Sequence, residues 1–330
     1  MKHTAIRPLL RTTLAAASVA VTALAVTAGT ASAAPVAAQG SPSANSAATA
    51  TAASTARHQL ARTATGKLVP VTPTDHHTPV HPEAVTHPSA DSMGSTVAAH
   101  EKQASTTSAA KASVVRPAAS VPQLPGIDVS DNQGDIDWAS VAPNIDFAYA
   151  KATEGTYYTN GDFANQYNGP YDAGVIRGAY HFAIPNNSTG TAQADYFIAH
   201  GGGWSADGKT LPGALDIEYN PYGAECYGLS QSSMVDWVWD FVNEYASREG
   251  VYPVIYTTTD WWTSCTGNYS GFAAYDPLWV ANYSASGGGT LPAGWGYYTF
   301  WQYADSGSEP GDQDVFDGAY SQLQVLADKG

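Results

Sequence analysis

The sequence predicts an α/β barrel of about eight strands that lacks its last helices and follows a long disordered segment. Three observations lead to this prediction. All 37 aromatic residues (9 Trp, 20 Tyr and 8 Phe) of the 330-residue chain lie after residue 121. Beyond that point, eight short runs rich in β-branched and aromatic residues alternate with helix-compatible stretches, as in βα units. A complete barrel of this kind ordinarily takes ~250 residues, so the 209 residues from 122 to 330 cannot accommodate every helix.

Residues 1–33 have the features of a secretory signal peptide. Basic residues at positions 2, 7 and 11 flank the apolar run LAAASVAVTALAV, and Ala31-Ser32-Ala33 offers a small-residue cleavage site. The apolar run is shorter than the ~20 residues that span a bilayer, which disfavours the alternative of a membrane anchor. We therefore expect a secreted protein with no membrane partner after signal cleavage.

Residues 34–121 are predicted to form a disordered stalk or pro-segment. Ala, Ser, Thr, Pro and Val dominate this stretch, and Phe, Trp and Tyr do not occur in it. Such a segment cannot easily bury enough apolar surface to offset the entropy lost in ordering its backbone. His76, His77, His81 and His87 form a loose cluster here. Their spacing matches no compact metal site, so we expect neither a metal nor a cofactor.

The remaining part, residues 122–330, is expected to be one acidic globular domain. It contains 25 Asp and Glu but only five Lys and Arg, a formal net charge of −20. Proteins that bind nucleic acid gain affinity by neutralising phosphates with basic residues. Nucleic acid is therefore excluded as a partner, and we expect the protein to be a monomer.

Cys226 and Cys265 are the only cysteines of the chain. In an exported protein an isolated pair is expected to form a disulfide, which here would close a loop of about 40 residues. Two buried free thiols are the alternative.

The elements can be placed along the domain by composition and spacing. Helices are expected over 160–174, 190–200 and 231–249, and the last of these follows Ser230, a natural N-cap. The intervals between the last three strands, SASGGGTLPAGWG and DSGSEPGD, are rich in Gly and Pro, so we expect no helices there. The expected strands are 126–130, 147–152, 177–183, 214–219, 252–257, 278–283, 298–304 and 313–316.

Acidic residues lie at or just after several of these strands. They are Asp128, the pair Asp216 and Glu218, and the cluster around Asp312 and Asp314. Catalytic residues of α/β barrels sit at the C-terminal ends of the strands. We therefore expect these carboxyl groups to converge at one mouth of the barrel.

The pair Asp216 and Glu218 lies one residue apart in the apolar run ALDIEY. On a strand, residues i and i+2 face the same side and lie ~6.6 Å apart along it. Burial and like charge would raise the pKa of one carboxyl, leaving a proton donor beside a stabilising anion. Breaking a glycosidic bond needs such a pair. The alternatives are surface residues or ion-pair partners, but few basic residues exist to pair with these acids.

Seven segments, taken together, carry a resemblance to one known family. They are GIDVSDNQGDIDW, AYAKATEGTYY, IRGAYHFAIPNN, TAQADYFIAHGGGW, LPGALDIE, VIYTTTDWW and TFWQYAD. In these segments, and over essentially all of residues 124–330, the chain is similar to the Chalaropsis-type lysozymes, glycoside hydrolase family 25. The resemblance implies an irregular flattened (β/α) barrel, about (β/α)5β3, and it does not cover the preceding disordered segment.

The resemblance implies a secreted or wall-associated lysozyme that hydrolyses the β-1,4 bond from N-acetylmuramic acid to N-acetylglucosamine in peptidoglycan, and some family members accept O-acetylated muramic acid. It implies that Glu218 is the general acid/base and Asp216 the stabilising carboxylate. Asp128 would be a further active-site acid, and Asp312 would be the acid of the last strand. Asp314 becomes the equivalent residue if one gap is shifted.

The resemblance also implies a set of cleft residues. A lysine inside a strand pattern needs an acidic partner, so a structural ion pair is an alternative role for Lys151. His181 should face the opposite side of its strand from Tyr180, which favours a core histidine over a catalytic one. The implied substrate-binding residues are Lys151, Glu154, Tyr180, Tyr256, Tyr283, Trp301 and Gln302.

Several alternatives remain open from the sequence. Many bacterial members of the family read DVSHWQG where this chain reads DVSDNQG, so a substrate contact at the cleft edge could differ at Asp131 and Asn132. Asp216 could attack the sugar directly or orient the substrate's own acetamide, and both routes retain configuration. A non-catalytic wall-binding protein and a chitinase-like glycosidase are the alternative functions.

Overall fold

The computed structural model describes residues 60–62, 68–70, 92–107, 121–284 and 287–330. The predicted signal peptide and the cluster of His76, His77, His81 and His87 lie outside these residues. Within the segment predicted to be disordered, the structure describes the short strands β1 (Leu60–Arg62) and β2 (Leu68–Pro70) and the helix α1 (Val97–Thr107). None of the helices described is long and apolar enough to cross a membrane.

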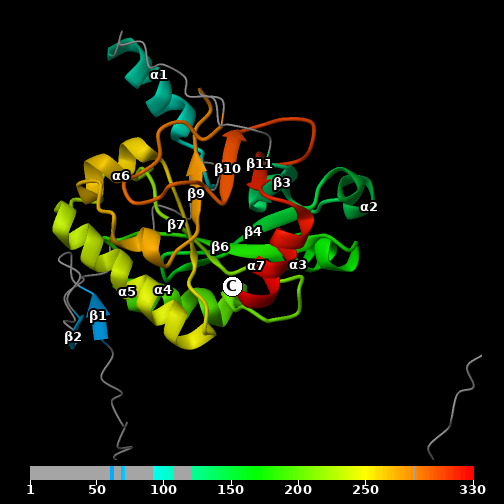
Figure 1. Cartoon of the computed structure of the whole chain (residues 1–330), viewed down its shortest axis with the longest axis horizontal. Coiled ribbons are helices and arrows are strands. Elements are labelled where there is room, and N and C mark those ends of the chain that lie inside the picture. The colour runs from blue at the N-terminus through cyan, green and yellow to red at the C-terminus, as the bar shows by residue number, and fades with distance from the viewer. Residues whose placement is uncertain (1–59, 63–67, 71–91, 108–120, 285–286) are drawn as a thin grey trace, which may run out of the picture. The chain divides into compact units, whose positions relative to one another are not determined.

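The domain is a closed barrel, and the described part of the chain contributes eight strands to it (Figure 1). Each strand is hydrogen-bonded to two others, and the pairing of β3 with β4 closes the ring. The short strand β5 (Tyr158–Thr159) pairs with the end of β4 alone. The barrel strands are β3 (Gln123–Val129), β4 (Phe147–Glu154), β6 (Ile176–Phe182), β7 (Ala214–Asp216), β8 (Val254–Thr257), β9 (Leu278–Ala281), β10 (Phe300–Ala304) and β11 (Asp312–Asp317).

The barrel strands from β3 to β10 pair with one another in parallel, but β11 runs antiparallel to both β10 and β3. A barrel made only of βα units would have parallel strands throughout, and the last strand departs from that pattern. The reason is the length of the connection between β10 and β11, residues 305–311. A parallel crossover needs a dozen or more residues, whereas an antiparallel hairpin needs only a few.

Helices follow most of the strands and pack on the outside of the barrel (Figure 1). The N-cap predicted at Ser230 is confirmed, because its hydroxyl accepts a hydrogen bond from the backbone N–H of Ser233 at 3.2 Å. Short 3₁₀ helices cover Asp131–Gln133, Ala142–Asn144 and Gly271–Ala274, and a π-helical turn covers Ile198–Gly202. The α-helices are α2 (Trp138–Val141), α3 (Phe163–Asp172), α4 (Gly190–Phe197), α5 (Gln231–Glu249), α6 (Thr259–Thr266) and α7 (Tyr320–Lys329).

The expected absence of helices between the last three strands is confirmed for the residues that the structure describes there. Without a helix, the outer face of β9 still has to be covered. Leu278 and Val280 on that face pack with Tyr298, Leu291 and Trp295 from the connection to β10. An apolar loop thus replaces a helix, which explains how a barrel forms in a domain shorter than usual.

The side chains of the strands alternate between the barrel interior and the helix-covered exterior. On β4, Phe147 and Tyr149 belong to the interior cluster, whereas Ala148 and Ala150 pack outward. Two residues of α7, Leu323 and Ala327, join the interior cluster together with Phe316, which lies opposite the starts of β3 and β10. Helix α7, which the sequence analysis did not predict, therefore closes the barrel at the end where the parallel strands begin.

The predicted disulfide is confirmed: Cys226 and Cys265 are bonded, with their Cα atoms 5.3 Å apart. The bond joins the loop after β7 to helix α6. That loop also carries Tyr222 and Tyr227, which lie near the carboxyl end of β7. The crosslink therefore restrains a loop that borders the mouth of the barrel.

Removing the crosslink should destabilise the domain. We expect the double variant Cys226→Ala with Cys265→Ala to lose about 3 to 4 kcal/mol of unfolding free energy, because a loop of 39 residues is no longer closed in the unfolded state. Urea unfolding of the variant and the parent chain measures the difference. Free thiols detected in the native parent protein would contradict the assignment.

Candidate active site

The carboxyl ends of the parallel strands bring the predicted acids together at one mouth of the barrel. Asp128 lies near the end of β3, and Asp216 ends β7 with Glu218 two residues beyond it. Because β11 is antiparallel, its first residue lies at this same mouth, where Asp312 is opposite Asp128. The expected convergence is confirmed, including the contribution of the strand that runs in the other direction.

Asp216 and Glu218 both face the barrel mouth, as the two-residue period predicts. Leu215 and Ile217, the residues that alternate with them, belong to the outer cluster under the helices. The extended conformation continues beyond β7, because the N–H of Ile217 donates to the carbonyl oxygen of Tyr256 at 3.0 Å. Both carboxyl groups are buried. Neither side-chain oxygen of Asp216 has a hydrogen-bond partner among the described residues.

Burial shifts the protonation of this pair. It raises the pKa of Glu218 to about 8, although the donors that reach its oxygens partly offset the effect. Burial and the neighbouring Glu218 raise the pKa of Asp216, and the charge of Lys151 opposes the shift. Two like charges this close in a site with little water are costly, so the pair holds a proton near neutral pH. The arrangement supplies one proton donor and one hydrogen-bond acceptor.

A second group of acids lies on β3 and β11. Asp128 and Asp312 both accept hydrogen bonds from Nε2 of Gln302, at 2.7 and 3.0 Å. Asp314 lies deeper, fully buried, and accepts a hydrogen bond from Nε1 of Trp279 at 3.0 Å. Burial raises the pKa of Asp128 to about 7 and that of Asp312 to about 10. The sequence left Asp312 and Asp314 as alternatives, and the structure brings both into the cluster.

Gln302 connects these acids to two tyrosines. Its Oε1 accepts hydrogen bonds from the hydroxyls of Tyr256 at 2.6 Å and Tyr283 at 2.7 Å. Its Nε2 donates to the two carboxyl groups of the second acidic cluster. All four contacts are compatible with only one orientation of the amide, so Gln302 fixes the positions of side chains from β3, β8, β11 and the end of β9.

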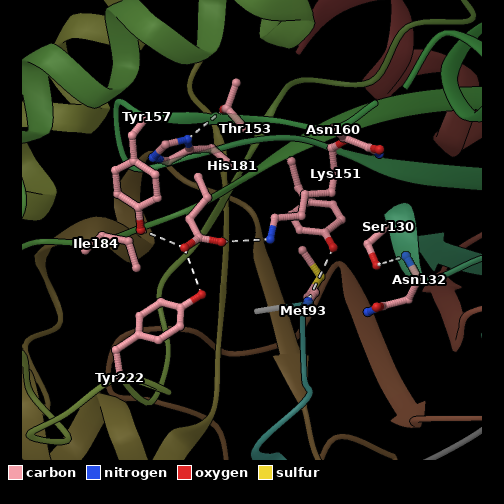
Figure 2. Close-up of polar contacts among 12 residues, drawn as sticks. Met93, Ser130, Asn132, Lys151, Thr153, Tyr157, Asn160, His181, Ile184 and Tyr222 are labelled. Carbon is pink, nitrogen blue, oxygen red and sulfur yellow. Dashed lines mark hydrogen bonds and ion pairs between the residues drawn. The ribbon is translucent and has the colours of Figure 1, made fainter. Parts of the chain in front are cut away.

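Lys151 forms a buried ion pair with Glu154, with 2.9 Å between Nζ and Oε2 (Figure 2). The other oxygen of Glu154 accepts hydrogen bonds from the hydroxyls of Tyr157 at 2.7 Å and Tyr222 at 2.9 Å. The structural ion pair considered as an alternative for Lys151 is therefore present. Its charge also lowers the pKa of both Asp216 and Glu218.

The sequence analysis missed Tyr157 and Tyr222 as partners of Glu154. Tyr157 lies just beyond the end of β4, and Tyr222 lies in the loop that follows β7. Their position after the carboxyl ends of barrel strands, where active-site residues lie, is the signal that could have identified them.

Trp301 faces the other side of its strand from Gln302. Its strand neighbours Phe300 and Gln302 face the interior, so Trp301 faces outward. There it pairs with Val280, packs with the outer cluster of β9, and donates its Nε1–H to the carbonyl oxygen of Asn282 at 2.9 Å. Because side chains alternate along a strand, Trp301 lies on the outer face of the barrel, whereas the resemblance implied a substrate-binding residue of the cleft.

The prediction for His181 is confirmed. Its ring lies on the outer face of the barrel, where it is close to Phe197 and Phe241. Nδ1 is 2.8 Å from the hydroxyl of Thr153, and Nε2 is 2.9 Å from Oε1 of Gln193 (Figure 2 shows the Thr153 contact). Burial lowers the pKa of His181 to about 4. It is a core histidine with both nitrogens occupied.

Residues 92–97 reach the same site, which the sequence analysis did not anticipate. The N–H of Gly94 donates to Oε1 of Glu218 at 2.6 Å, and the hydroxyl of Thr96 donates to Oε2 at 3.3 Å. The N–H of Met93 is 3.3 Å from the hydroxyl oxygen of Tyr180 (Figure 2). The composition of this segment, poor in large apolar residues, carried no signal for such a contact.

A metal site was not expected, and one grouping of possible ligands occurs in the part of the chain that the structure describes. It consists of Glu225, Cys226 and Cys265. The two cysteines form the disulfide, so their sulfurs are not available as thiolate ligands.

Comparisons with known proteins identify close relatives. The family model described as Glycosyl hydrolases family 25 matches residues 127–312. The chain is 52% identical to Lysozyme M1 of Streptomyces globisporus over 208 residues, covering 61% of this chain and 70% of that protein. It is 48% identical to the N,O-diacetylmuramidase of Chalaropsis sp over 206 residues, covering 61% and 98%. The solved structure of a muramidase from Acremonium alcalophilum is 56% identical, with a TM-score of 0.61, and covers 63% of this chain and 100% of that one.

The buried acids should make the domain less stable as the pH rises. Their folded pKa values lie above the ordinary values near 4, so the folded state binds more protons than the unfolded state between about pH 4 and pH 8. The stability that the protonated acids contribute is fully present below about pH 4 and is lost as the pH rises through their pKa values in the folded state. His181 acts oppositely, but only as the pH falls below about 6.5. Urea unfolding from pH 6.5 to 8.5 should therefore show a decreasing unfolding free energy.

A matched pair of variants tests the source of this slope. Asp314→Asn removes a fully buried carboxyl whose pKa is raised, so the slope should become shallower by up to about 1.4 kcal/mol per pH unit. Asp328→Asn makes the same change at an exposed position of α7. A parent protein whose stability does not change with pH in this window would contradict the prediction.

Proposed function

Because the chain belongs to glycosyl hydrolases family 25, we propose that it hydrolyses the β-1,4 bond between N-acetylmuramic acid and N-acetylglucosamine with retention of configuration. The protein is a glycoside hydrolase, a lysozyme of the muramidase type that acts on peptidoglycan. One observation carries the mechanism: Asp216 and Glu218 lie side by side and buried at the mouth of the barrel. We assign the catalytic domain to residues 122–330.

Glu218 is the general acid in the first step. Its raised pKa keeps the carboxyl protonated near neutral pH, so it can donate a proton to the glycosidic oxygen as the bond to the anomeric carbon breaks. The same carboxylate, now ionised, removes a proton from the water that completes hydrolysis. Burial favours both steps, because an acid with a pKa near the working pH gives and takes protons with similar ease.

Asp216 holds the N-acetyl group of the muramic acid. Both of its oxygens lack hydrogen-bond partners in the described part of the chain, and an acetamide N–H would satisfy one of them. Held in this way, the acetamide carbonyl oxygen attacks the anomeric carbon as the bond to the leaving oxygen breaks. Water then opens the cyclic intermediate, and the two inversions give retention.

Direct attack by Asp216 is the alternative to this route, and two probes separate them. A thiazoline analogue of N-acetylmuramic acid mimics the cyclised acetamide and should inhibit the enzyme if the acetamide is the nucleophile. A 2-fluoro sugar that becomes covalently attached to Asp216 would establish direct attack instead.

The remaining polar side chains of the mouth position the sugars. Asp128 and Asp312, held by Gln302, offer acceptors for sugar hydroxyls, and Tyr256 and Tyr283 complete the same network. Lys151 reduces the charge repulsion among the acids and keeps Glu154 in place. Each residue is kept in position by another polar group, which favours a preorganised site.

The protein is proposed to act outside the cell as a monomer. The signal peptide inferred for residues 1–33 and the disulfide between Cys226 and Cys265 both fit an exported protein. The mass of the secreted chain tests removal of the signal peptide, and its size in solution tests whether it is a monomer.

The products of hydrolysis identify the bond that is cut. Purified peptidoglycan is digested with the protein, the released fragments are reduced with borohydride, and their ends are read by mass spectrometry. Fragments that end in reduced muramic acid support the proposed bond. Ends at reduced glucosamine would indicate a glucosaminidase, and an absence of fragments would favour a protein that only binds the wall.

Replacing the acid should remove hydrolysis but not the fold. We expect Glu218→Gln to lower activity on peptidoglycan by at least about 100-fold, because an amide of the same size cannot donate the proton. The matched control Glu225→Gln changes an exposed residue after the same strand and should retain activity. Thermal unfolding of both variants verifies that each is folded. A folded Glu218→Gln variant with normal activity would overturn the assignment.

A further inference from the structure

We propose that residues 92–107 are an intramolecular inhibitor of the active site, and that the enzyme becomes fully active only when this segment leaves the mouth of the barrel. The inference rests on the proposed role of Glu218 in hydrolysis. The inhibitory segment is the turn at residues 92–96 together with helix α1. It lies ahead of the domain in the chain, within the part that the sequence analysis described as a stalk or pro-segment.

Both oxygens of the proposed acid are occupied by the inhibitory segment. Oε1 of Glu218 accepts the backbone N–H of Gly94 at 2.6 Å, and Oε2 accepts the hydroxyl of Thr96 at 3.3 Å. In the substrate complex one of these oxygens has to carry the proton that passes to the glycosidic oxygen. A sugar cannot approach that oxygen while the segment is bound.

The same two contacts also favour the wrong protonation state of Glu218. A backbone N–H and a hydroxyl that donate to a carboxylate stabilise its ionised form. Both contacts lower the pKa of Glu218, against the larger effect of burial. The segment therefore blocks the acid in space, and its two donors favour the ionised form of Glu218, although burial keeps the pKa of Glu218 raised.

Gly94 is suited to this close approach in two ways. Its backbone has φ +76°, a conformation that residues with a Cβ rarely adopt. A Cβ built at this position would clash with the hydroxyl of Tyr283 and with Oε1 of Gln302. Glycine avoids both the backbone strain and these contacts, so it lets the backbone approach Glu218 closely.

Further contacts hold the segment on either side of Gly94. Met93 and Val97 are almost fully buried and belong to the same interior cluster as Tyr180 and Tyr256. Their burial offsets the entropy of ordering a stretch that is otherwise poor in large apolar residues.

The helix adds two polar and aromatic contacts at the rim. The ring of His100 stacks on Tyr219, with 3.6 Å between ring centroids and an interplanar angle of 10°. Oε1 of Glu101 accepts the backbone N–H of Tyr283 at 2.8 Å, and the hydroxyl of Tyr283 is 3.3 Å from the carbonyl oxygen of Gly94. An aromatic face and a backbone N–H at the rim are groups that a sugar strand would also use.

The covalent connection to the domain makes a weak contact sufficient. A ligand tethered by a short linker has an effective concentration of about 1 mM. A segment with a Kd of about 0.1 mM would then occupy the site in roughly nine of ten intact molecules, but would dissociate from a separated domain at micromolar concentration. A helix of 11 residues is marginal alone in water, so release and unfolding of the segment would go together.

The domain does not need the segment in order to fold. The 63% of this chain that matches the muramidase from Acremonium alcalophilum covers 100% of that solved chain. The comparison with the Chalaropsis protein is similar, with 98% of that relative covered by 61% of this chain. Residues 122–330 can therefore be tested as a separate protein.

The first experiment compares three proteins on purified peptidoglycan: residues 34–330, the same chain with Gly94→Val, and residues 122–330. We expect the domain alone to be about 10-fold more active than the longer chain, from the occupancy above. Gly94→Val should raise the longer chain to within about twofold of the domain, because valine cannot adopt this backbone conformation or fit beside Tyr283 and Gln302. Ala99→Gln, at an exposed position of α1, is the matched control and should leave the inhibition unchanged.

A peptide in trans separates the inference from the proposed function. A synthetic peptide of residues 92–107 should inhibit residues 122–330 with a Kd near 0.1 mM and shift the amide NMR signal of Tyr283, whereas the Gly94→Val peptide should do neither. Hydrolysis by all three proteins at equal rates, with no binding of the peptide, would overturn the inference and leave the function intact. If none of the proteins hydrolyses peptidoglycan, the proposed function fails. In that case, binding of the peptide at Tyr283 would still support the segment as a ligand of the site. Failure of the peptide to bind would overturn the inference.

Discussion

The cost of charging several carboxyl groups in one place with little water governs this structure. Asp128, Asp216, Glu218, Asp312 and Asp314 are all buried or nearly so at the same mouth, and burial raises the pKa of each. Such a cluster is stable only if protons are shared and each remaining charge finds a donor. Gln302 donates hydrogen bonds to Asp128 and Asp312, and Trp279 donates one to Asp314. The charge of the nearby Lys151 opposes the rise in the pKa of Asp216 and Glu218.

The barrel is what makes the cluster possible, because it brings the ends of strands distant in sequence to one place. Parallel strands deliver their last residues to the mouth, and the antiparallel strand β11 delivers its first residue, Asp312, to the same height as Asp128. Closure by the pairing of β3 with β4 fixes the spacing. Helix α7 at the other end and the apolar loop over β9 complete the core without the helices that a full-length barrel has.

The properties that prepare this site for a sugar also make it a site for the chain itself. An oxygen that must accept and release a proton is a strong hydrogen-bond acceptor. The N–H of Gly94 donates to this oxygen and so occupies the place where a glycosidic oxygen would accept its proton. At the rim, the ring of Tyr219 stacks on His100, and the backbone N–H of Tyr283 donates to Glu101. Inhibition by residues 92–107 therefore needs no second binding site. It needs only the covalent connection to the domain and the close approach that Gly94 allows.

The strands, the missing helices, the pairing of Asp216 with Glu218 and the outward direction of His181 could be predicted from the sequence, because they depend on local periodicity, turn composition and the alternation of side chains along a strand. The disulfide could be predicted because Cys226 and Cys265 are the only cysteines of a chain with the features of an exported protein. The outward direction of Trp301, the antiparallel direction of β11 and the contact of Tyr222 with Glu154 became visible only in the folded chain. Only the tertiary structure placed Gly94 against Glu218. These outcomes depend on which segments meet across the closed barrel, and residues 124 positions apart leave no local pattern of their contact.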